Sequence, residues 1–173
     1  MKSVLISIQP KWCELIANGK KTIEVRKTRP RIETPFKVYI YCTYGNEKEN
    51  YCVGKRGKVI GEFVCDRIYE IKNLGSSFMI GNDIALTNRT ARESCLEFPD
   101  LRAYLRDKNG YAWHISKLKI YDKPKELGEF SYPCPDKNYD TCFGCKYFYH
   151  DETEMCCKKE AVRPPMSWCY VEE

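Results

Sequence analysis

The chain has 173 residues, of which 43% are hydrophobic and 13% aromatic, and its 29 Lys and Arg outnumber its 24 Asp and Glu. A chain of about this length buries roughly 68–70% of the surface that its unfolded form exposes, which excludes disorder as its main state. No apolar run approaches the ~18 residues of a membrane-spanning helix, and we expect neither such a helix nor a signal peptide.

Charge is distributed unevenly along the chain. The last forty residues hold five basic and eight acidic side chains, so they carry −3 and the preceding 133 residues carry +8. A basic body of this kind attracts phosphate groups in a salt-dependent way. A solvated, lysine-rich surface explains the same counts, so charge alone leaves both interpretations open.

The first predicted elements are a short strand and a helix. Residues 4–8 predict a buried strand, and Pro10 suits the first position of a helix that Gly19 ends. Trp12 recurs with Leu15 and Ile16 at helical spacing. That face of the helix is therefore predicted to lie in the core.

The next element is a strand over residues 22–26, in which apolar and polar side chains alternate strictly. This period is typical of a half-buried strand. Its apolar members are predicted to point into the core. The opposite face carries Thr22, Glu24 and Arg26, and Lys21 lies at the entrance of the strand.

Strands outnumber helices in the rest of the chain. Residues 38–43, 58–71 and 111–121 have strand character, and Gly61 predicts a bulge or tight bend in the second of these. Inward parity changes within the third, as at a bulge. Residues 166–171 regain strand character and could rejoin the sheet.

One helical region is predicted between these strands. The capping-box spacing at residues 90–93 predicts the start of a helix. Pro99 then interrupts that helix or begins a new one.

The opening of the chain carries a family motif. Residues 7–10 read Ser-Ile-Gln-Pro, and the following helix and strand contain the pattern Gly-x-Lys-x-x-Glu-x-Arg. The matching residues are Gly19, Lys21, Glu24 and Arg26. With the strand at 58–71, this motif resembles the ASCH domain family of the PUA-like superfamily, over roughly residues 1–125.

The resemblance implies a mainly β, α+β fold, namely a PUA-like curved β-barrel with flanking helices. Residues 163–172 are similar to the end of a bacterial and phage-type subgroup with a cysteine-rich extension. We therefore expect a barrel domain over residues 1–125. A small, metal-stapled extension over residues 126–173 follows, with its final strand rejoining the barrel.

The polar face of the strand at 22–26 is the candidate binding site. An arginine can fork onto phosphate, and a carboxylate can accept from an exocyclic amine such as that of cytosine. Lys21, Thr22, Glu24 and Arg26 are the predicted ligand-binding residues. From the residues alone, a surface ion pair worth ~0–1 kcal/mol is the alternative.

The resemblance implies a ligand and a possible activity. ASCH and related domains are thought to bind RNA or modified nucleosides in this cleft. Some members are amidohydrolases that remove acyl groups from N4-acylated cytidine with a Lys, a Thr nucleophile and a carboxylate. Lys21 matches that Lys, but Glu24 stands at the Thr position. If the chain is an enzyme, Lys21 and Glu24 are its catalytic candidates, with Glu24 as a base towards water.

Histidines and aromatic residues offer weaker candidates. The chain has only two histidines, and His114 is interpreted as a packed residue rather than a catalyst. Exposed aromatic rings could stack on bases. The candidates are Tyr39, Tyr41, Trp113 and Trp168, although rings that alternate in a small barrel usually belong to its core, as we expect for Trp12.

The 11 cysteines fall into two groups. Five are scattered before residue 125 and are interpreted as buried small hydrophobic residues, and six lie between residues 134 and 169. Without an export signal we expect a reducing, cytoplasmic location, where disulfides are rare. The clustered cysteines are therefore predicted to bind a metal.

A structural Zn²⁺ site is the preferred interpretation of the cluster, because four thiolates close a tetrahedral shell and order a segment that lacks a core. Cys142 and Cys145 form a CxxC pair, preceded by Cys134. Spacing leaves Cys156 and Cys157 open as the fourth ligand, and the subgroup's usual spacing to Arg-Pro-Pro implies Cys157. A redox pair, an iron–sulfur cluster, or disulfides in an exported chain are alternatives.

Partners follow from these sites. RNA or a nucleoside is the expected ligand, and no membrane partner is expected. A third hypothesis is that the acidic extension recruits a protein partner.

Overall fold

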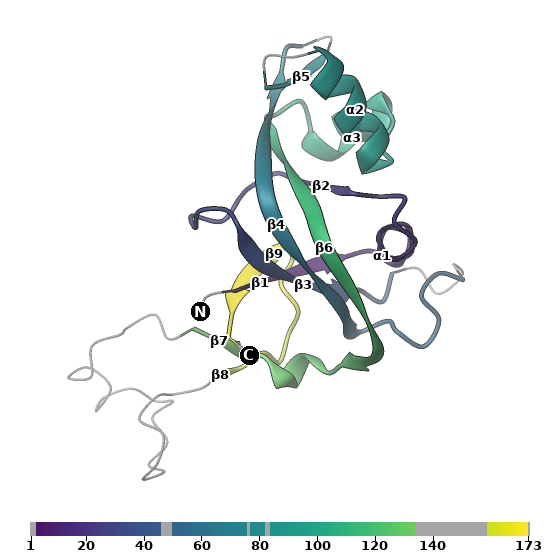
Figure 1. Ribbon diagram of the computed structural model, residues 1–173, viewed down its shortest axis with the longest axis vertical. Helices are drawn as coiled ribbons and strands as arrows, with labels where there is room; N and C mark the ends of the chain where they lie inside the picture. Colours follow the sequence, from purple (N-terminus) through teal and green to yellow (C-terminus); the bar gives the residue numbers. More distant parts are fainter. Residues whose placement is uncertain (1–2, 46–49, 76, 82–83, 134–158, 173) are drawn as a thin grey trace, which may run out of the picture.

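The computed structural model describes residues 3–45, 50–75, 77–81, 84–133 and 159–172 (Figure 1). The elements in chain order are β1 (Ser3–Ile8), α1 (Pro10–Ala17), β2 (Ile23–Arg26), β3 (Phe36–Cys42), β4 (Lys58–Asn73), β5 (Phe78–Ile80), α2 (Ile84–Ser94), α3 (Phe98–Leu105), β6 (Gly110–Lys125), the 3₁₀ turn η1 (Leu127–Glu129), β7 (Ser131–Tyr132), β8 (Lys159–Glu160) and β9 (Trp168–Val171). The fold is mainly β with a few helices, as predicted.

The main sheet is open. Its strands follow the order β2-β6-β4-β3-β1-β9, with β5 paired to β4, while β7 and β8 form a separate two-stranded sheet. β1 runs parallel to β3, and β9 runs antiparallel to β1. β2 and β9 are the two edges, so no backbone ladder closes the predicted barrel within the described residues. The barrel expectation is corrected to a curved open sheet.

β4 and β6 are the two longest strands, each of 16 residues, and they bend together. Their register shifts at three places along the pairing. A Cβ on Gly61 would lie 2.5 Å from the Lys119 carbonyl oxygen, so only glycine permits this close approach. The predicted bend at Gly61 and the predicted change of parity in β6 are both confirmed.

The helices follow the predictions in part. α1 begins at Pro10 and stops before Gly19, whose φ of +68° lies in the left-handed region. α3 has Pro99 in its first turn, as predicted. The predicted helix start at residues 90–93 is wrong, because α2 already begins at Ile84 and Thr90 lies inside it. A capping-box spacing also occurs within helices, so the pattern alone does not locate a start.

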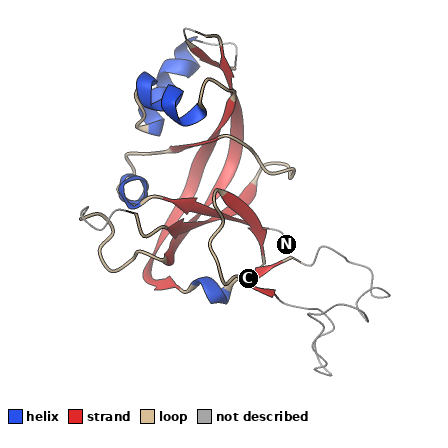
Figure 2. Ribbon diagram, turned by 180° about the vertical axis from the view of Figure 1, so that it is seen from behind, coloured by secondary structure: helices blue, strands red, loops and turns tan. Residues whose placement is uncertain are grey.

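Three apolar clusters hold the fold together. The main core lies inside the curve of the sheet and includes Val38 and Trp113. A second core joins β2 to β5 and α3 through residues such as Ile23 and Leu105. α2, α3 and β5 gather at one end of the molecule, and α1 lies on the other side of β2 (Figures 1 and 2).

The end of the chain returns to the sheet. β9 pairs with β1 over Ser3 to Ile6, which confirms the predicted final strand. A third apolar cluster packs Phe130, Ala161 and Val171 against Leu5 and Tyr39. The end of the chain therefore packs against the body of the molecule through these residues.

No helix in the described part of the chain is both long enough and apolar enough to cross a membrane.

Candidate functional site

β2 is a short strand that is buried on both faces. Ile23 and Val25 pack into the second core, as their parity predicts. Glu24 and Arg26 lie opposite Trp113 and Tyr111 of β6 in the strand register. Residues opposite one another share a face of the sheet, so the polar face of β2 borders the main core.

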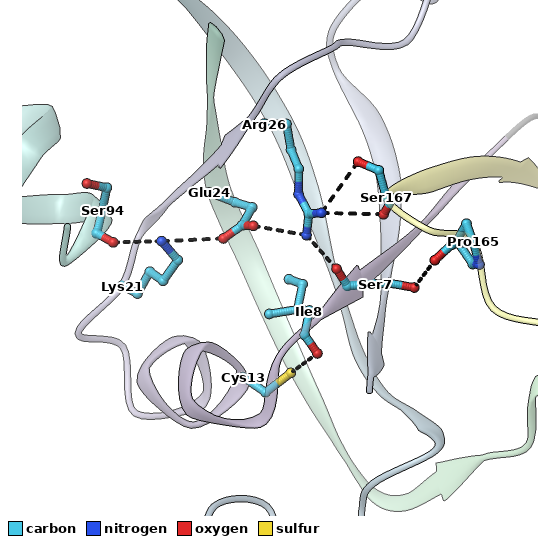
Figure 3. Close-up of polar contacts among 9 residues, drawn as sticks. All are labelled: Ser7, Ile8, Cys13, Lys21, Glu24, Arg26, Ser94, Pro165 and Ser167. Carbon is cyan, nitrogen blue, oxygen red and sulfur yellow. Dashed lines mark hydrogen bonds and ion pairs between the residues drawn. The ribbon is translucent and has the colours of Figure 1, made fainter. Parts of the chain in front are cut away.

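Three charged side chains meet on this polar face (Figure 3). Lys21 Nζ lies 3.3 Å from Glu24 Oε2, and Arg26 Nη2 lies 3.0 Å from Glu24 Oε1. The side chains of Lys21, Glu24 and Arg26 are only 2%, 8% and 8% exposed. The sequence-predicted residues therefore form one buried charged cluster, and the surface ion pair considered above is excluded.

Backbone oxygens from distant segments anchor the two cations (Figure 3). Lys21 Nζ donates to the Ser94 carbonyl oxygen at 2.6 Å, at the end of α2. Arg26 Nη2 donates to the Ser7 carbonyl oxygen in β1 at 2.6 Å, and Nη1 reaches Ser167 at 3.5 Å. Arg26 thus spans from edge strand β2 to β1 and to the segment before β9.

The cluster is expensive to bury, and its charges do not balance. Removing an ion from water costs several kcal/mol in a protein, and close pairing repays only part of that cost. Two cations share a single carboxylate, and carbonyl dipoles supply the remaining compensation. A buried site with excess positive charge favours an electron-rich or anionic ligand.

The cluster lines an open cleft of about 1000 Å³, here called the β2 cleft. The volume lies at the upper end of the ~300–1000 Å³ that small-molecule sites usually have. Four cations and two carboxylates line it, namely Lys11, Lys21, Arg26 and Lys27 against Glu24 and Asp100. The lining is therefore basic overall.

Two aromatic rings contribute to the β2 cleft from helices on either side of β2. The ring centroid of Trp12 in α1 lies 5.1 Å from Lys21 Nζ, and that of Tyr104 in α3 lies 5.1 Å from Lys27 Nζ. Burial raises the pKa of Tyr104, an effect that Arg26 offsets in part and Glu24 reinforces. The phenol therefore stays protonated at neutral pH and can donate a hydrogen bond.

Hydrogen-bonding capacity remains in the charged cluster. Arg26 Nε is buried without a hydrogen-bond partner among the described residues. A buried donor left without a partner costs about 1–3 kcal/mol, which adds to the cost of burying the cluster. Lys21 uses two of the three donors of an ammonium group, on Glu24 and Ser94.

Three residues near this site lie where the sequence alone did not place them. Thr22 does not line the β2 cleft, and its backbone instead bonds to Glu93 and Ile115. Trp12, expected in the core, is only partly buried and lines the cleft. Tyr104 was missed because the signal for it is spatial, since α3 is distant from β2 in the sequence.

The other aromatic candidates are mostly core residues. Tyr39, Tyr41 and Trp113 are at most 3% exposed and do not line the β2 cleft, so they are not placed to stack on a base there. Trp168 is partly buried, and its indole donates to Thr28 Oγ1 at 3.0 Å. The core interpretation of the alternating rings is confirmed for the first three.

His114 forms a polar pair away from the β2 cleft. Its Nδ1 lies 2.6 Å from Asp66 Oδ1. Neither residue lines the cleft. His114 thus has a defined partner outside the cleft, which is consistent with its interpretation as a packed, non-catalytic residue.

The predicted zinc ligands Cys134, Cys142, Cys145 and Cys157, and the alternative Cys156, lie outside the described residues. Within the described ranges, no group of three metal-binding side chains is arranged to hold an ion. The zinc site stays a prediction from spacing.

Comparisons with known proteins address the fold and the family. The crystal structure of an ASCH protein from Zymomonas mobilis matches with a TM-score of 0.60 and 19% identity, over 99% of this chain and 88% of that chain. A tyrosine-to-phenylalanine variant of that protein matches with a TM-score of 0.59 and 20% identity, over 100% of this chain and 92% of that one. At this identity the likeness establishes the fold alone.

The family evidence comes from the sequence. No curated protein matches the chain. The ASCH domain family model matches residues 6–76, which include the second half of β1, α1 and the whole charged cluster. Motif, family model and fold agree on an ASCH domain, whose family model matches residues 6–76 of the chain.

Proposed function

We propose that the β2 cleft binds RNA or a modified nucleoside, with a base lying against the Lys21–Glu24–Arg26 cluster. The observation that carries this proposal is a buried, net positive cluster lining an open cleft of about 1000 Å³. The match of residues 6–76 to the ASCH domain model supports the same ligand class, because this PUA-like family is associated with RNA.

The cluster offers both kinds of hydrogen-bonding group to a base. A carboxylate has about four acceptor positions, and each Glu24 oxygen accepts from only one cation of the cluster. Glu24 can therefore also accept from an exocyclic amine such as cytosine N4. The third Lys21 donor can donate to a base carbonyl.

The lining supplies stacking and attraction for phosphate. Trp12 and Tyr104 are placed to stack on a base, which contributes about 1–3 kcal/mol where contact is made. Lys11 and Lys27 are exposed beside them and can neutralise phosphates. Each phosphate contact to a single strand adds ~0.7 to the slope of log affinity against log salt concentration.

Titration of a fluorescent single-stranded RNA at several salt concentrations tests the proposal. Wild type should lose affinity steeply with salt, and Lys11→Ala/Lys27→Ala should reduce that slope by about 1.4 units, which is ~0.7 for each of two lost phosphate contacts. Both lysines are exposed, so the variant should fold. Lys58→Met is the matched control, because Lys58 is also partly exposed but lies outside the cleft. RNA affinity that does not change with salt would contradict the proposal.

A second titration addresses the base itself. Cytidine, N4-acetylcytidine, uridine and adenosine are compared by calorimetry with wild type and Glu24→Gln. Loss of preference between bases in Glu24→Gln, with the salt slope retained, assigns base recognition to the carboxylate. Identical base preferences in the two proteins would show that Glu24 does not take part in base recognition.

Hydrolysis of N4-acylated cytidine is the alternative activity. The Lys21 ammonium lies 3.3 Å from Glu24, so it could stabilise the charge that develops when Glu24 activates water. Acid release from N4-acetylcytidine by wild type but not by Glu24→Gln would make the chain an amidohydrolase. No release at high protein concentration would leave a binding module.

Zinc binding and partner recruitment by the extension are separate proposals, supported only by cysteine spacing and acidic charge. Elemental analysis of the full chain should find one zinc per chain, lost in Cys142→Ser/Cys145→Ser. Deleting residues 135–157 tests whether the extension recruits a protein partner. The deletion spares Phe130 and Ala161, which are buried. That deletion should leave RNA affinity unchanged.

A further inference from the structure

A second open cleft, of about 820 Å³, lies beside the β2 cleft. Residues 27–34, in the loop between β2 and β3, line it together with Ile68 of β4 and Tyr111 of β6, and we call it the loop cleft. The loop lies at the end of β2 that is farther from α1 (Figures 1 and 2). Lys27 and Thr28 line both clefts, so the two clefts adjoin at the start of the loop.

The loop carries three exposed cations at every second position, namely Lys27, Arg29 and Arg31. Glu33 is the only carboxylate among the described residues that line the loop cleft, so three cations stand against one anion. Within the described part of the chain, none of the three cations forms an ion pair with a carboxylate. An anion can therefore engage each of them without displacing a partner.

Contacts to β9 and the core hold the loop in place between those cations. Thr28 Oγ1 accepts a hydrogen bond from the Trp168 indole at 3.0 Å, and the Arg31 backbone nitrogen donates to the Tyr170 hydroxyl at 2.7 Å. Ile32 packs against the main core. Charges on a backbone that is already fixed lose less conformational freedom when they bind a ligand.

An aromatic ring distinguishes the loop cleft from a simple basic surface. Tyr111 is partly buried, and the guanidinium carbon of Arg29 lies 5.9 Å from its ring centroid. Bases stack on aromatic rings and on the planes of arginine side chains, and arginine also forks onto phosphate. The pair therefore suits both parts of a nucleotide, whereas an acidic peptide would use only the cations.

We propose that the loop cleft is a second nucleotide subsite, and that the ligand of the β2 cleft is a strand of RNA rather than a free nucleoside. The strand leaves the β2 cleft over Lys27 and Thr28, its next phosphates lie against Arg29 and Arg31, and a flanking base lies on Tyr111. This inference rests on the proposed function, because the β2 cleft holds the first base.

The dependence of affinity on RNA length tests the inference. Unlabelled cytidine and oligocytidylates of two, four and eight nucleotides compete with a labelled octanucleotide for the full chain. Affinity should rise from cytidine to the octanucleotide, because only the longer strands reach the loop cleft. Equal affinities for cytidine and the octanucleotide would overturn the inference and leave the proposed function standing as a nucleoside site. No binding of the octanucleotide by wild type would contradict both.

Two double variants separate the loop cleft from general attraction by the basic body. Arg29→Gln/Arg31→Gln should reduce the salt slope for the octanucleotide by ~1.4, which weakens binding about 25-fold at 0.1 M salt, and should leave cytidine affinity unchanged. Both side chains are exposed, so the variant should fold. Arg92→Gln/Arg106→Gln is the matched control, because it removes the same charge from exposed arginines outside both clefts. The same weakening in both double variants would rule out the loop cleft as a subsite.

Ultraviolet cross-linking of the bound RNA locates the strand on wild type. Trypsin places Tyr111 in residues 109–117, Trp12 in 12–20 and Tyr104 in 103–106. The dinucleotide should cross-link to Trp12 or Tyr104 in the β2 cleft, and the octanucleotide should add a cross-link at Tyr111. An identical set of cross-linked peptides for the two lengths would contradict the path of the strand.

A peptide of eight glutamates tests whether the loop cleft prefers RNA to other polyanions. It carries a similar number of charges but no bases. It should compete with the octanucleotide at least about fivefold more weakly than RNA of the same length, because it cannot stack on Tyr111. Equal competition by the peptide would make the loop cleft a general anion surface and exclude RNA as its specific occupant.

Discussion

The two faces of β2 differ in chemistry although both are buried. One face carries Ile23 and Val25, which pack into the core beneath α3. The other carries Glu24 and Arg26, which complete a charged cluster with Lys21 in the β2 cleft. Four residues thus build both an apolar anchor and a polar site.

The comparison shows how a short strand can hold charges in position. The apolar face is fully packed, so the strand cannot move without opening the second core. A functional constellation needs support of this kind to keep its geometry. The apolar face therefore contributes stability, and the polar face costs stability that a ligand can recover.

The largest expected effect is that of Glu24→Gln. This change leaves two buried cations without their carboxylate, and breaking a buried pair in this way costs about 3–5 kcal/mol. The free energy of unfolding in urea measures it. Glu126→Gln, at a carboxylate that is 63% exposed, is the control and should cost less than about 1 kcal/mol. Equal losses of unfolding free energy in the two variants would show that burial of the charged cluster does not increase its contribution to stability.

A smaller effect is expected on the apolar face. Ile23 is fully buried, so Ile23→Val removes one methylene from the second core and should cost about 0.5–1.5 kcal/mol. Affinity for RNA should not change, because the cluster stays intact. A large loss of affinity would show that the two faces are coupled more tightly than their packing suggests.

An exposed ion pair gives the reference for both faces. Lys58 Nζ lies 2.6 Å from Glu126 Oε1, but the side chains are 38% and 63% exposed. Lys58→Met should therefore change the free energy of unfolding by about 0–1 kcal/mol. A change as large as that of Glu24→Gln would contradict burial as the cause of the difference between the pairs.

The smallest effect is a pH dependence near β2, on β4 and β6. Burial raises the pKa of Asp66, but hydrogen bonding and charge from His114, with the charge of Arg67, lower it below its usual value of 3.8. This contribution to stability is present above that value and is lost as the pH falls through the lower, folded-state pKa. The difference in unfolding free energy between wild type and Asp66→Asn should therefore shrink below about pH 4. If the difference in unfolding free energy stayed constant between pH 5 and pH 2, Asp66 would not contribute to the loss of stability in acid.

The elements near the start of the chain were predicted well because their signals are local. Pro10, Gly19 and the alternation through Arg26 fix where α1 and β2 begin and end, and Gly61 marks the bend of β4. The start of α2 was predicted wrongly because the spacing at Thr90 fits the interior of a helix as well as its first turn.

The candidate site was predicted only in part, for a related reason. The motif identified Lys21, Glu24 and Arg26, and their alternation gave a shared face. It did not reveal that the face is buried, since the segments that contact its cations, at Ser94, Ser7 and Ser167, are distant in the sequence. Thr22 shares the parity of Glu24 but lies outside the β2 cleft, because the cleft covers only part of that face.

The sequence by itself determined the strand and helix periods, the family motif and the basic character of the body, because each is written in neighbouring residues. Only the tertiary structure decided that the sheet stays open between β2 and β9, and that Ser94 and Ser7 anchor the cations. Those contacts join residues up to 73 positions apart in the chain, and chain folding alone brings them together.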